Sequence, residues 1–436
     1  MNIGTNIELE DIKEFSKEYN KNMDNKKIEK EINQYGLDKV CLNRKVIEEN
    51  PPIFNIELSE TKRYDQKGSL RCWAFAGINV IKRNMASNLN IDIMEFELSD
   101  NFIAFFHRLE KANTNYERII SSKTTDLSKI AKMELIKEPV EETGNWHNFV
   151  SIVRKYGLVP MKVMPITVEG ENATKVNRLF SEMVKKNIVA LAELKKQNKN
   201  MQDIRKAKAK MLEEDYEFLS KVYGEPVNKF DYKYTDKSGK EISIKDITPN
   251  EFVKRFLSID IENFIFISNV PNGIKKYGQK FKDPRYINVY KNKYVEYLHI
   301  SSNELKELAV KQLKENIPVM VGIYIRKFAD KETGVLDTRL YNYEKLVNYK
   351  KLDKANRILL GDIELHHWMT ITGVQIEDEI PKRWKVEDSY GNKEKVNGYY
   401  IMNDNYFDEY VFTIIVHKKY LTEKQLKLYN EKSIME

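Results

Sequence analysis

The sequence contains very little cysteine, with Cys41 and Cys72 as its two thiols among 436 residues. Disulfide-stapled secreted folds and cysteine-rich zinc sites both need more thiols than this, so both classes are excluded. Long apolar runs are missing too, and no stretch approaches the length of a membrane span. The opening residues, MNIGTNIELEDIKEF, are acidic and lack the apolar core of a signal peptide. We therefore expect a cytoplasmic protein with reduced thiols and no membrane contact.

A strong excess of charge of one sign is also missing. The 73 Lys and Arg residues nearly balance the 66 Asp and Glu residues, and the net charge of +7 is mild for this length. Such a balance permits contact with nucleic acid but does not argue for it. Hydrophobic residues make up 41% and charged residues 32%, which predicts a packed core. The length requires two or three packed units, or one large domain with insertions.

The first half of the chain is predicted to be mostly helical. Apolar periodicity predicts helices in the first forty residues, from Cys72 onward, and over 99–113 with Ser99 as N-cap. A further helix over 145–156 is expected to end at a glycine. The charged stretch 171–225 predicts an exposed helical hairpin inserted into a larger body.

The last third of the chain changes to strands. Residues 226–247 predict a strand pair around a Lys-Ser-Gly turn, and Thr248 predicts the cap of a short helix. Later segments rich in β-branched and aromatic residues predict strands in IPVMVGIYI, HHWMTITGVQI, RWKVEDSY, GYYIMND and EYVFTIIVHKKY. Helices first and a mostly antiparallel sheet last indicate an α+β fold with a cleft between the two parts.

One constellation of residues carries chemistry. Cys72 stands at the predicted start of a helix, where the positive end of the helix dipole favours the nucleophilic thiolate. Gln66, six residues upstream across a turn, can direct its amide at an oxyanion formed beside the thiol. Far downstream, His366 and His367 share a predicted strand, and Asp388 follows another. A thiol, a base and a group that orients the base complete an activated nucleophile.

The remaining thiol and histidines have no comparable surroundings. Cysteine is among the most often buried residues, and a lone cysteine is usually structural. We expect a structural role for each of Cys41, His107, His147, His299 and His417.

The segment around Cys72 resembles the nucleophile signature of papain-type cysteine peptidases, with Gln66 six residues before Cys-Trp-Ala-Phe. The similarity is closest to the bleomycin hydrolase and aminopeptidase C branch and covers nearly the whole chain. It includes LNRKVIEEN, FELSDNFIAFFHRLEKAN, NWHNFVSIVRKYGLVP, GEPVNKFDYKY, ITPNEFV, GVLDTRLYNYEKL, ITGVQIEDEIPKRWKVEDSYGN and YFDEYVFTIIVHKKYL.

This resemblance implies site roles residue by residue. Cys72 matches the nucleophile and Gln66 the oxyanion-hole glutamine. His367 matches the catalytic histidine by its spacing to ITGV and VEDSYG, whereas His366 points to the opposite face of the strand. Asp388 falls where the family has an asparagine that orients the histidine.

The resemblance also implies a papain-like fold with a long helical insertion. The expected parts are the N-terminal helices and lead-in segment (1–65) and the helical part with the nucleophile (66–170). They are followed by the helical insertion with a connecting hairpin (171–300) and by the antiparallel β part with the catalytic His and Asp (301–436). The implied activity is an aminopeptidase-like cysteine peptidase acting on peptides without a metal or organic cofactor. The implied assembly is a homohexameric barrel whose active sites face an inner channel.

Several residues near the expected substrate cleft depart from the family. Leu70 replaces a glycine, Trp368 replaces an alanine, and Tyr390 replaces the tryptophan that covers the histidine–asparagine hydrogen bond. Asp388 replaces the asparagine itself and should hold the histidine proton more tightly. Together with Trp73, the residues Leu70, Trp368 and Tyr390 are expected to shape the cleft.

The family chain continues into an arm whose terminal carboxylate captures the free amine of the substrate, but this sequence stops at Ile434-Met435-Glu436. An open cleft and endopeptidase action are expected if the arm is absent. The alternatives are that Glu436 itself reaches the cleft, or that the sequence is incomplete.

Two other functions compete with the active peptidase. One is a weakened or inactive homologue that serves in binding or assembly. The other is nucleic-acid binding, which the resemblance raises and for which the Lys-rich segment 195–210 is the local basic run. A solvated helix face is the simpler interpretation of that run.

Overall fold

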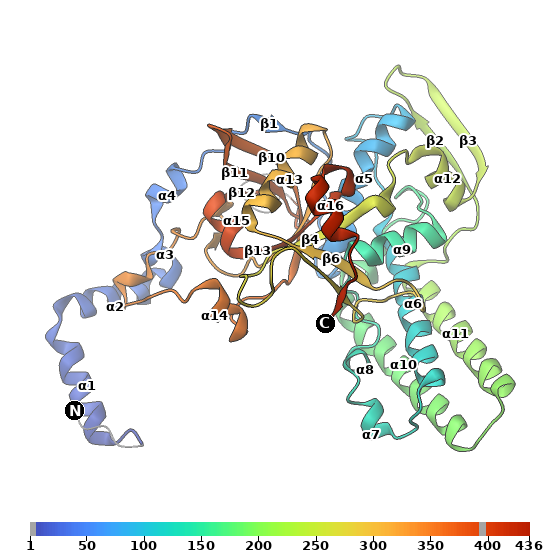
Figure 1. Ribbon diagram of the computed structural model, residues 1–436, viewed down its shortest axis with the longest axis horizontal. Coiled ribbons are helices and arrows are strands. Elements are labelled where there is room, and N and C mark those ends of the chain that lie inside the picture. The colour runs from blue at the N-terminus through green and yellow to red at the C-terminus, as the bar shows by residue number, and fades with distance from the viewer. Residues whose placement is uncertain (1–5, 392–397) are drawn as a thin grey trace.

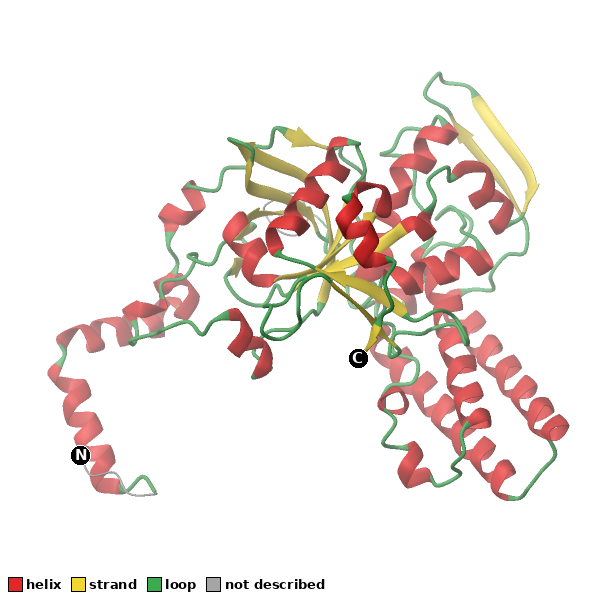
Figure 2. Cartoon of the chain, in the orientation of Figure 1, coloured by secondary structure: helices red, strands yellow, loops and turns green. Residues whose placement is uncertain are grey.

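The computed structural model describes residues 6–391 and 398–436. Most strands gather in the centre of the molecule with helices on both sides of them, and a separate two-stranded hairpin lies at the outer edge (Figure 2). Two groups of elements therefore build the fold, a helical part and a large sheet with its own covering helices.

The N-terminal helices run along one side and lead away from the body (Figure 1). They are α1 (Leu9–Lys21), α2 (Met23–Tyr35), α3 (Leu37–Cys41) and α4 (Arg44–Glu48). No residue of α1 or α2 is buried, so these helices place their apolar side chains in solvent. The prediction of helices in this region is confirmed.

The helical part is built around one buried helix. Its elements are α5 (Cys72–Leu89), α6 (Asp100–Ser121), α7 (Leu127–Ile130), α8 (Glu134–Lys137), α9 (Trp146–Tyr156), α10 (Ala173–Lys196), α11 (Met201–Tyr223) and α12 (Pro249–Phe256), with the hairpin of β2 (Phe230–Thr235) and β3 (Glu241–Ile247). Helix α5 is buried on nearly all sides, as its apolar sequence requires. The helix therefore forms the centre of this part, and its first residue is Cys72.

Local capping chemistry fixes several of these helix ends. The Ser99 hydroxyl accepts a hydrogen bond from the Phe102 N–H at the start of α6. Thr248 and Glu251 form a capping box at the start of α12. Gly157 ends α9 with φ +79°, a conformation that favours glycine. The predicted caps are confirmed.

The predicted helical hairpin is confirmed as α10 and α11, which pack against α6 (Figure 1). Apolar residues of α10 recur at helical spacing and are buried: Val176, Phe180, Val184, Ile188 and Leu191. The hairpin thus extends the core of the helical part along α6.

The large sheet has the order β14-β5-β6-β4-β13-β7-β10-β11-β12-β9-β8, and β1 pairs with β10. Its strands are β1 (Ile56–Glu57), β4 (Phe264–Ser268), β5 (Gln279–Asp283), β6 (Val295–His299), β7 (Val319–Ile323), β8 (Ala329–Asp330), β9 (Val335–Leu336), β10 (His367–Glu377), β11 (Ile380–Glu387), β12 (Tyr399–Asn403), β13 (Val411–His417) and β14 (Ile434–Met435). The strands predicted in the last third are confirmed as β7, β10, β11, β12 and β13.

Seven of the described strands of this sheet were not predicted, namely β1, β4, β5, β6, β8, β9 and β14. Strands β4, β5 and β6 lie within 171–300, the segment that the sequence assigns to the insertion. Strand β4 is a short continuous apolar run, which periodicity cannot distinguish from buried helix. Strand β5, QKFKD, contains two lysines and an aspartate, which are poor strand formers. Residues 264–299 therefore add to the sheet.

Helices cover the face of the sheet that points away from the helical part. They are α13 (Ser302–Lys314), α15 (Asp404–Tyr410) and α16 (Glu423–Tyr429), while α14 (Lys354–Leu359) is tied to α15 by the Arg357–Glu409 ion pair. One core lies between the sheet and the helical part, and a second lies under α13 and α15. A search of the described helices finds none long and apolar enough to cross a membrane.

Candidate active site

Cys72 is the first residue of α5 and is partly exposed. The chain reaches it through a tight turn, in which the Ser69 N–H donates to the Gln66 carbonyl oxygen at 2.9 Å. The first N–H groups of a helix lack partners inside the helix, and the dipole is positive there. The thiol therefore lies where a negative sulfur is stabilised.

His367 is the first residue of β10 and is almost fully buried, with 6% of its surface exposed. Its Nε2 lies 2.8 Å from Asp388 Oδ1. Burial alone would lower the pKa of His367, but the negative charge of Cys72 and the hydrogen-bonded Asp388 outweigh this effect. The pKa of His367 is raised well above its usual value, which is the direction that favours the imidazolium.

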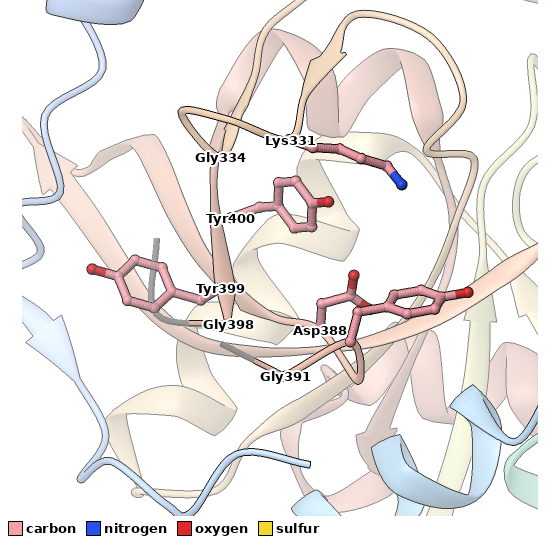
Figure 3. Close-up of a pocket in the computed structure, with 8 residues that line it drawn as sticks. Lys331, Gly334, Asp388, Gly391, Gly398, Tyr399 and Tyr400 are labelled. Carbon is pink, nitrogen blue, oxygen red and sulfur yellow. The ribbon is translucent and has the colours of Figure 1, made fainter. Parts of the chain in front are cut away.

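Asp388 directly follows β11, and its Oδ1 also accepts a hydrogen bond from the Ser389 N–H at 2.7 Å. The carboxylate thus has two donors on one oxygen. On its other side is a pocket of about 10 Å³, which has room for about one water molecule. Lys331, Tyr400 and Asp388 line this pocket (Figure 3).

The two adjacent histidines lie in different environments. His366 packs against the Tyr324 ring at 5.0 Å between centroids and lines the large cleft described below. Burial, together with the positive charges of His367 and Arg326, lowers the pKa of His366 to about 4. The structure thus brings His367, and not His366, to Asp388 and Cys72.

Gln66 is buried, and its backbone N–H donates to the Ser389 carbonyl oxygen at 2.6 Å. The loop before Cys72 is thereby tied to the residue after Asp388. The Gln66 Oε1 has no hydrogen-bond partner among the described residues. Gln66 thus joins the segment that precedes α5 to the loop that follows β11.

A cavity of about 790 Å³ opens between the helical part and the sheet, with Cys72 in its wall. Leu70, Cys72, the α6 face, the loop 137–145 and Asn148 form one side. The other side comes from β4 to β6, residues 283–287 and 364–368, and the start of β13. A cleft of this size accommodates a peptide of several residues. In the described part of the chain, no group of three or more metal-ligating side chains lies close enough to hold a metal ion.

A family model described as "Peptidase C1-like family" matches residues 6–435. The chain belongs to this family. It is 32% identical to aminopeptidase C of Lactobacillus delbrueckii subsp. lactis over 87% of this chain and 84% of that protein. It is 31% identical to aminopeptidase C of Listeria monocytogenes, covering 99% of this chain and 97% of that protein. It is 30% identical to a Saccharomyces cerevisiae protein named cysteine proteinase 1, mitochondrial, covering 95% of this chain and 87% of that protein.

The crystal structure of PepW from Lactobacillus rhamnosis HN001 matches with a TM-score of 0.93 and 30% identity. The match covers 99% of this chain and 98% of that chain. The family and the papain-like α+β fold predicted from the sequence are confirmed, and the chain is a cysteine-type peptidase by membership.

Leu70, where the family was expected to have glycine, adopts φ +62°. This left-handed conformation is one that glycine adopts freely and that costs a branched residue about 1–2 kcal/mol. The Leu70 side chain is 43% exposed and lines the cleft beside Cys72. The backbone conformation is therefore that of a glycine turn, while the side chain narrows the cleft.

Trp368 occupies the floor of the cleft and is 7% exposed. Its ring meets Phe266 edge to face at 6.3 Å. Gly322 makes room for it, since a Cβ there would lie 3.1 Å from the Trp368 ring and 2.7 Å from Leu365. The lack of a side chain at Gly322 in β7 thus leaves the space that the Trp368 ring occupies beside His367.

The other two residues expected to shape the cleft are Trp73 and Tyr390. Trp73 lines the cleft, and its buried indole N–H donates to the Glu142 carbonyl oxygen at 2.7 Å, which fixes the ring in the cleft wall. Tyr390 is 42% exposed and stacks on His367 at 5.8 Å between ring centroids, which partly covers the imidazole.

A buried charge network behind Cys72 was missed by sequence reasoning. Arg71 lies 2.8 Å from Asp100 and 2.5 Å from Glu142, and Arg108 lies 2.7 Å from Glu142. All four side chains are fully buried. They are far apart in sequence, and no local pattern pairs them. The network fixes the residue before the thiol to α6 and to the wall that contains Glu142.

The last residues of the sequence lie beside the cleft. Strand β14 pairs in parallel with β5, and the Glu436 N–H donates to the Lys282 carbonyl oxygen at 3.1 Å. The Glu436 carboxylate forms an ion pair with Lys275 and lies 3.8 Å from Arg285. Lys275 and Arg285 both line the cleft. Of the alternatives above, Glu436 reaching the edge of the cleft agrees with these contacts.

Proposed function

We propose that this chain is a cysteine aminopeptidase in which Cys72, His367, Asp388 and Gln66 perform the chemistry. The Cys72 thiolate attacks the carbonyl carbon of the peptide bond. The resulting oxyanion accepts hydrogen bonds from the Gln66 side chain and from the N-terminus of α5. His367 donates its proton to the amine, which leaves as the C–N bond breaks and a thioester forms.

Water completes the reaction. His367, now neutral, removes a proton from the water as its oxygen attacks the thioester carbon. The thiolate leaves, the acid product departs, and the thiolate–imidazolium pair is restored. Asp388 holds Nε2 throughout, so that Nδ1 is the nitrogen that exchanges protons at the sulfur and the substrate.

The surroundings of His367 are the observation that supports this proposal best. A buried imidazole with a carboxylate on one nitrogen and a thiol facing it has the arrangement of an activated nucleophile. Cys41, by contrast, is fully buried, and burial raises the pKa of its thiol. The two cysteines thus provide an internal comparison.

Labelling with a peptide vinyl sulfone at pH 7 tests the nucleophile. We expect modification of Cys72 faster than of free cysteine, no modification in Cys72→Ala, and full retention of labelling in Cys41→Ala. His367→Ala should slow peptide hydrolysis by about 10² to 10⁴. Labelling of Cys72 no faster than free cysteine would favour the alternative of an inactive binding or assembly homologue.

Exopeptidase selectivity is tested with matched free and N-acetylated peptides. The bacterial relatives named aminopeptidase C and the position of Glu436 beside the cleft support an aminopeptidase. We expect the free peptides to be cleaved faster. Equal rates would instead support the open cleft and endopeptidase action considered from the sequence.

A homo-oligomer is part of the proposal, and its expected form is the hexamer implied by the resemblance. The N-terminal arm, residues 6–35, supports assembly because it exposes apolar side chains without covering them: Ile7, Leu9, Ile12, Phe15, Tyr19, Met23 and Tyr35. Single-chain proteins rarely leave such a row in water. Sedimentation of Ile12→Glu/Phe15→Glu beside the unmodified chain should show a smaller particle.

Nucleic-acid binding receives little support. Within the basic run, Lys195 donates to the carbonyl oxygens of Ile119 and Ser122, and Arg205 and Lys208 pair with Glu117. These side chains stabilise the hairpin rather than forming a free basic face. Binding to DNA with steep salt dependence would reverse this assignment. The cytoplasmic location stays a prediction from the sequence.

A further inference from the structure

Helix α6 lines the cleft with four polar residues, and three of them are engaged by the protein itself. Lys111 donates to the carbonyl oxygens of Glu141 and Thr143 at 2.6 and 2.9 Å. Thr114 donates to the Asn288 carbonyl oxygen at 2.8 Å, and Asn115 donates to that of Pro139 at 2.8 Å. These three side chains hold the cleft wall in place.

Arg118 is the fourth and lines the same cavity, and its guanidinium has no ion-pair or hydrogen-bond partner within residues 6–391 and 398–436. Its side chain is partly buried, and burial lowers the pKa of its guanidinium. The groups that oppose this effect are the phenols of Tyr294 and Tyr290, and no carboxylate contributes. A partly buried guanidinium without an acceptor destabilises the folded chain, because its lost hydration is not replaced. The same guanidinium binds an incoming carboxylate strongly.

The other charged residues of the cleft do not provide that acceptor. On the opposite wall Arg285 is bound to Asp283 through both oxygens, and Lys275 is bound to Glu436. Glu141 accepts from the Thr143 hydroxyl. Glu138 and Glu364 also line the cavity, but both are exposed and neither is paired with Arg118. The remaining lining cation, Lys137, is exposed and adds positive charge to the same cavity.

The position of Arg118 along α6 sets its distance from the reacting thiol. Trp73, the neighbour of Cys72, packs on His107 at 4.6 Å between ring centroids. Arg118 lies eleven residues further along the same helix, which corresponds to about 16 Å at the helical rise per residue. An extended peptide covers that length with about five residues. Figure 1 shows α6 running away from α5 alongside the α10–α11 hairpin.

We propose that Arg118 forms a distal subsite that binds a carboxylate of the peptide substrate, about four to five residues from the bond that Cys72 attacks. This inference rests on the peptidase function proposed above. Bidentate contact between a guanidinium and a carboxylate gives both affinity and direction. The chain would thus favour peptides with an acidic residue or a free C-terminus at that distance over neutral peptides of the same length.

Binding to the Cys72→Ala chain tests the subsite without turnover. The probes are unblocked hexapeptide amides with one Glu at position three, four, five or six, each paired with the Gln peptide of the same sequence. We expect the Glu peptide to bind about 10-fold more tightly than its Gln partner at one of the distal positions. Arg118→Gln should remove this preference, and Arg118→Lys should keep only part of it because an ammonium lacks the planar fork.

Arg178→Gln is the matched control, since Arg178 is exposed on α10 outside the cleft and its loss changes the net charge equally. It should leave the Glu preference intact. Unchanged circular dichroism and melting temperature verify that each variant is folded. Equal affinity for Glu and Gln peptides at every position, a preference that survives Arg118→Gln, or no measurable binding of any peptide would each overturn the subsite.

The same chain with Cys72 intact separates this proposal from the catalytic one. Absence of hydrolysis and of Cys72 labelling, together with an acid preference that depends on Arg118, would reject the enzyme and keep the anion subsite. Hydrolysis and labelling without that preference would reject the subsite and keep the enzyme.

Discussion

Both walls of the cleft contain a buried ionisable side chain whose charged form is stabilised by neighbours of opposite charge, but the two side chains have different roles. On the helical wall, burial would raise the pKa of Glu142, and Arg108 and Arg71 outweigh it so that the pKa falls. On the sheet wall, burial would lower the pKa of His367, and Cys72 and Asp388 outweigh it so that the pKa rises. In both places an opposite charge replaces the lost water.

The difference lies in whether the partners can exchange a proton. Arginine stays protonated at any ordinary pH, so the helical network is a fixed support. The sheet wall pairs an imidazole with a thiol, and a proton can pass between them. One wall therefore holds the nucleophile in place, and the other moves its proton.

The largest expected effect comes from breaking the fixed network. Glu142→Gln leaves Arg71 and Arg108 buried with one charge fewer to share, which should lower the free energy of unfolding by about 3–5 kcal/mol. Urea unfolding measures this loss. Glu141→Gln, one residue away and partly exposed, should change it by less than about 0.5 kcal/mol. Similar losses for both variants would contradict a special role for the network.

Asp215 is a second buried carboxyl in the helical part, and unlike Glu142 it has no cation paired with it among the described residues. Burial raises the pKa of Asp215 to about 7, and within the described residues its carboxyl accepts a hydrogen bond from the Tyr116 hydroxyl at 2.7 Å. The folded state thus keeps a proton that the unfolded chain loses near pH 4, and stability falls as the pH rises from about 4 to 7. Asp215→Asn should therefore stabilise the chain by about 2 kcal/mol at pH 8 and by little at pH 4.

Denaturant unfolding at both pH values measures this difference. Glu213→Gln, exposed on the same helix, provides the control. A stabilisation by Asp215→Asn that is equal at pH 4 and pH 8 would show that the carboxyl does not titrate in this range.

On the sheet wall, Asp388→Asn restores the residue that the family was expected to have. Removing the negative charge lowers the pKa of His367, because the carboxylate is one of the groups that raise it. The imidazolium is then lost at lower pH, and the alkaline limb of kcat/KM should move down by about 1 pH unit. A pH profile measures this, and His366→Asn should leave the limb in place. An unmoved limb in Asp388→Asn would separate Asp388 from the proton transfer.

The smallest expected effect concerns the strained turn between the walls. Leu70→Gly relieves the left-handed backbone and should stabilise the chain by about 1 kcal/mol in urea unfolding. Leu70→Ala keeps a Cβ at φ +62° and should not. Equal stability of the Gly and Ala variants would assign the effect to the lost side chain instead.

Much of this arrangement could be predicted because its signals are local. The start of α5 at Cys72, the Ser99 cap and the Thr248 capping box each depend on a few consecutive residues. Alternation and β-branched content likewise predicted β7 and β13. Family motifs pointed to His367, which is the histidine that the structure brings to Asp388.

What the sequence did not reveal depends on partners that only the fold brings together. Arg71 is followed by Cys72 in the motif, but nothing nearby indicates that Asp100 and Glu142 neutralise it. Strand β5 is stabilised by pairing with β6 on one side and β14 on the other rather than by its own lysine-rich sequence.

Strand β13 lies in the middle of the sheet, between β4 and β7, yet it is nearly the last strand of the chain. A ribosome delivers β4 and β7 long before it delivers β13, and until then both strands have open edges. Cys72 and His367 are themselves about 300 residues apart, so their meeting depends on late, long-range pairing. We therefore expect a nascent chain that still lacks β13 to be unable to hydrolyse peptides, although it already contains both Cys72 and His367.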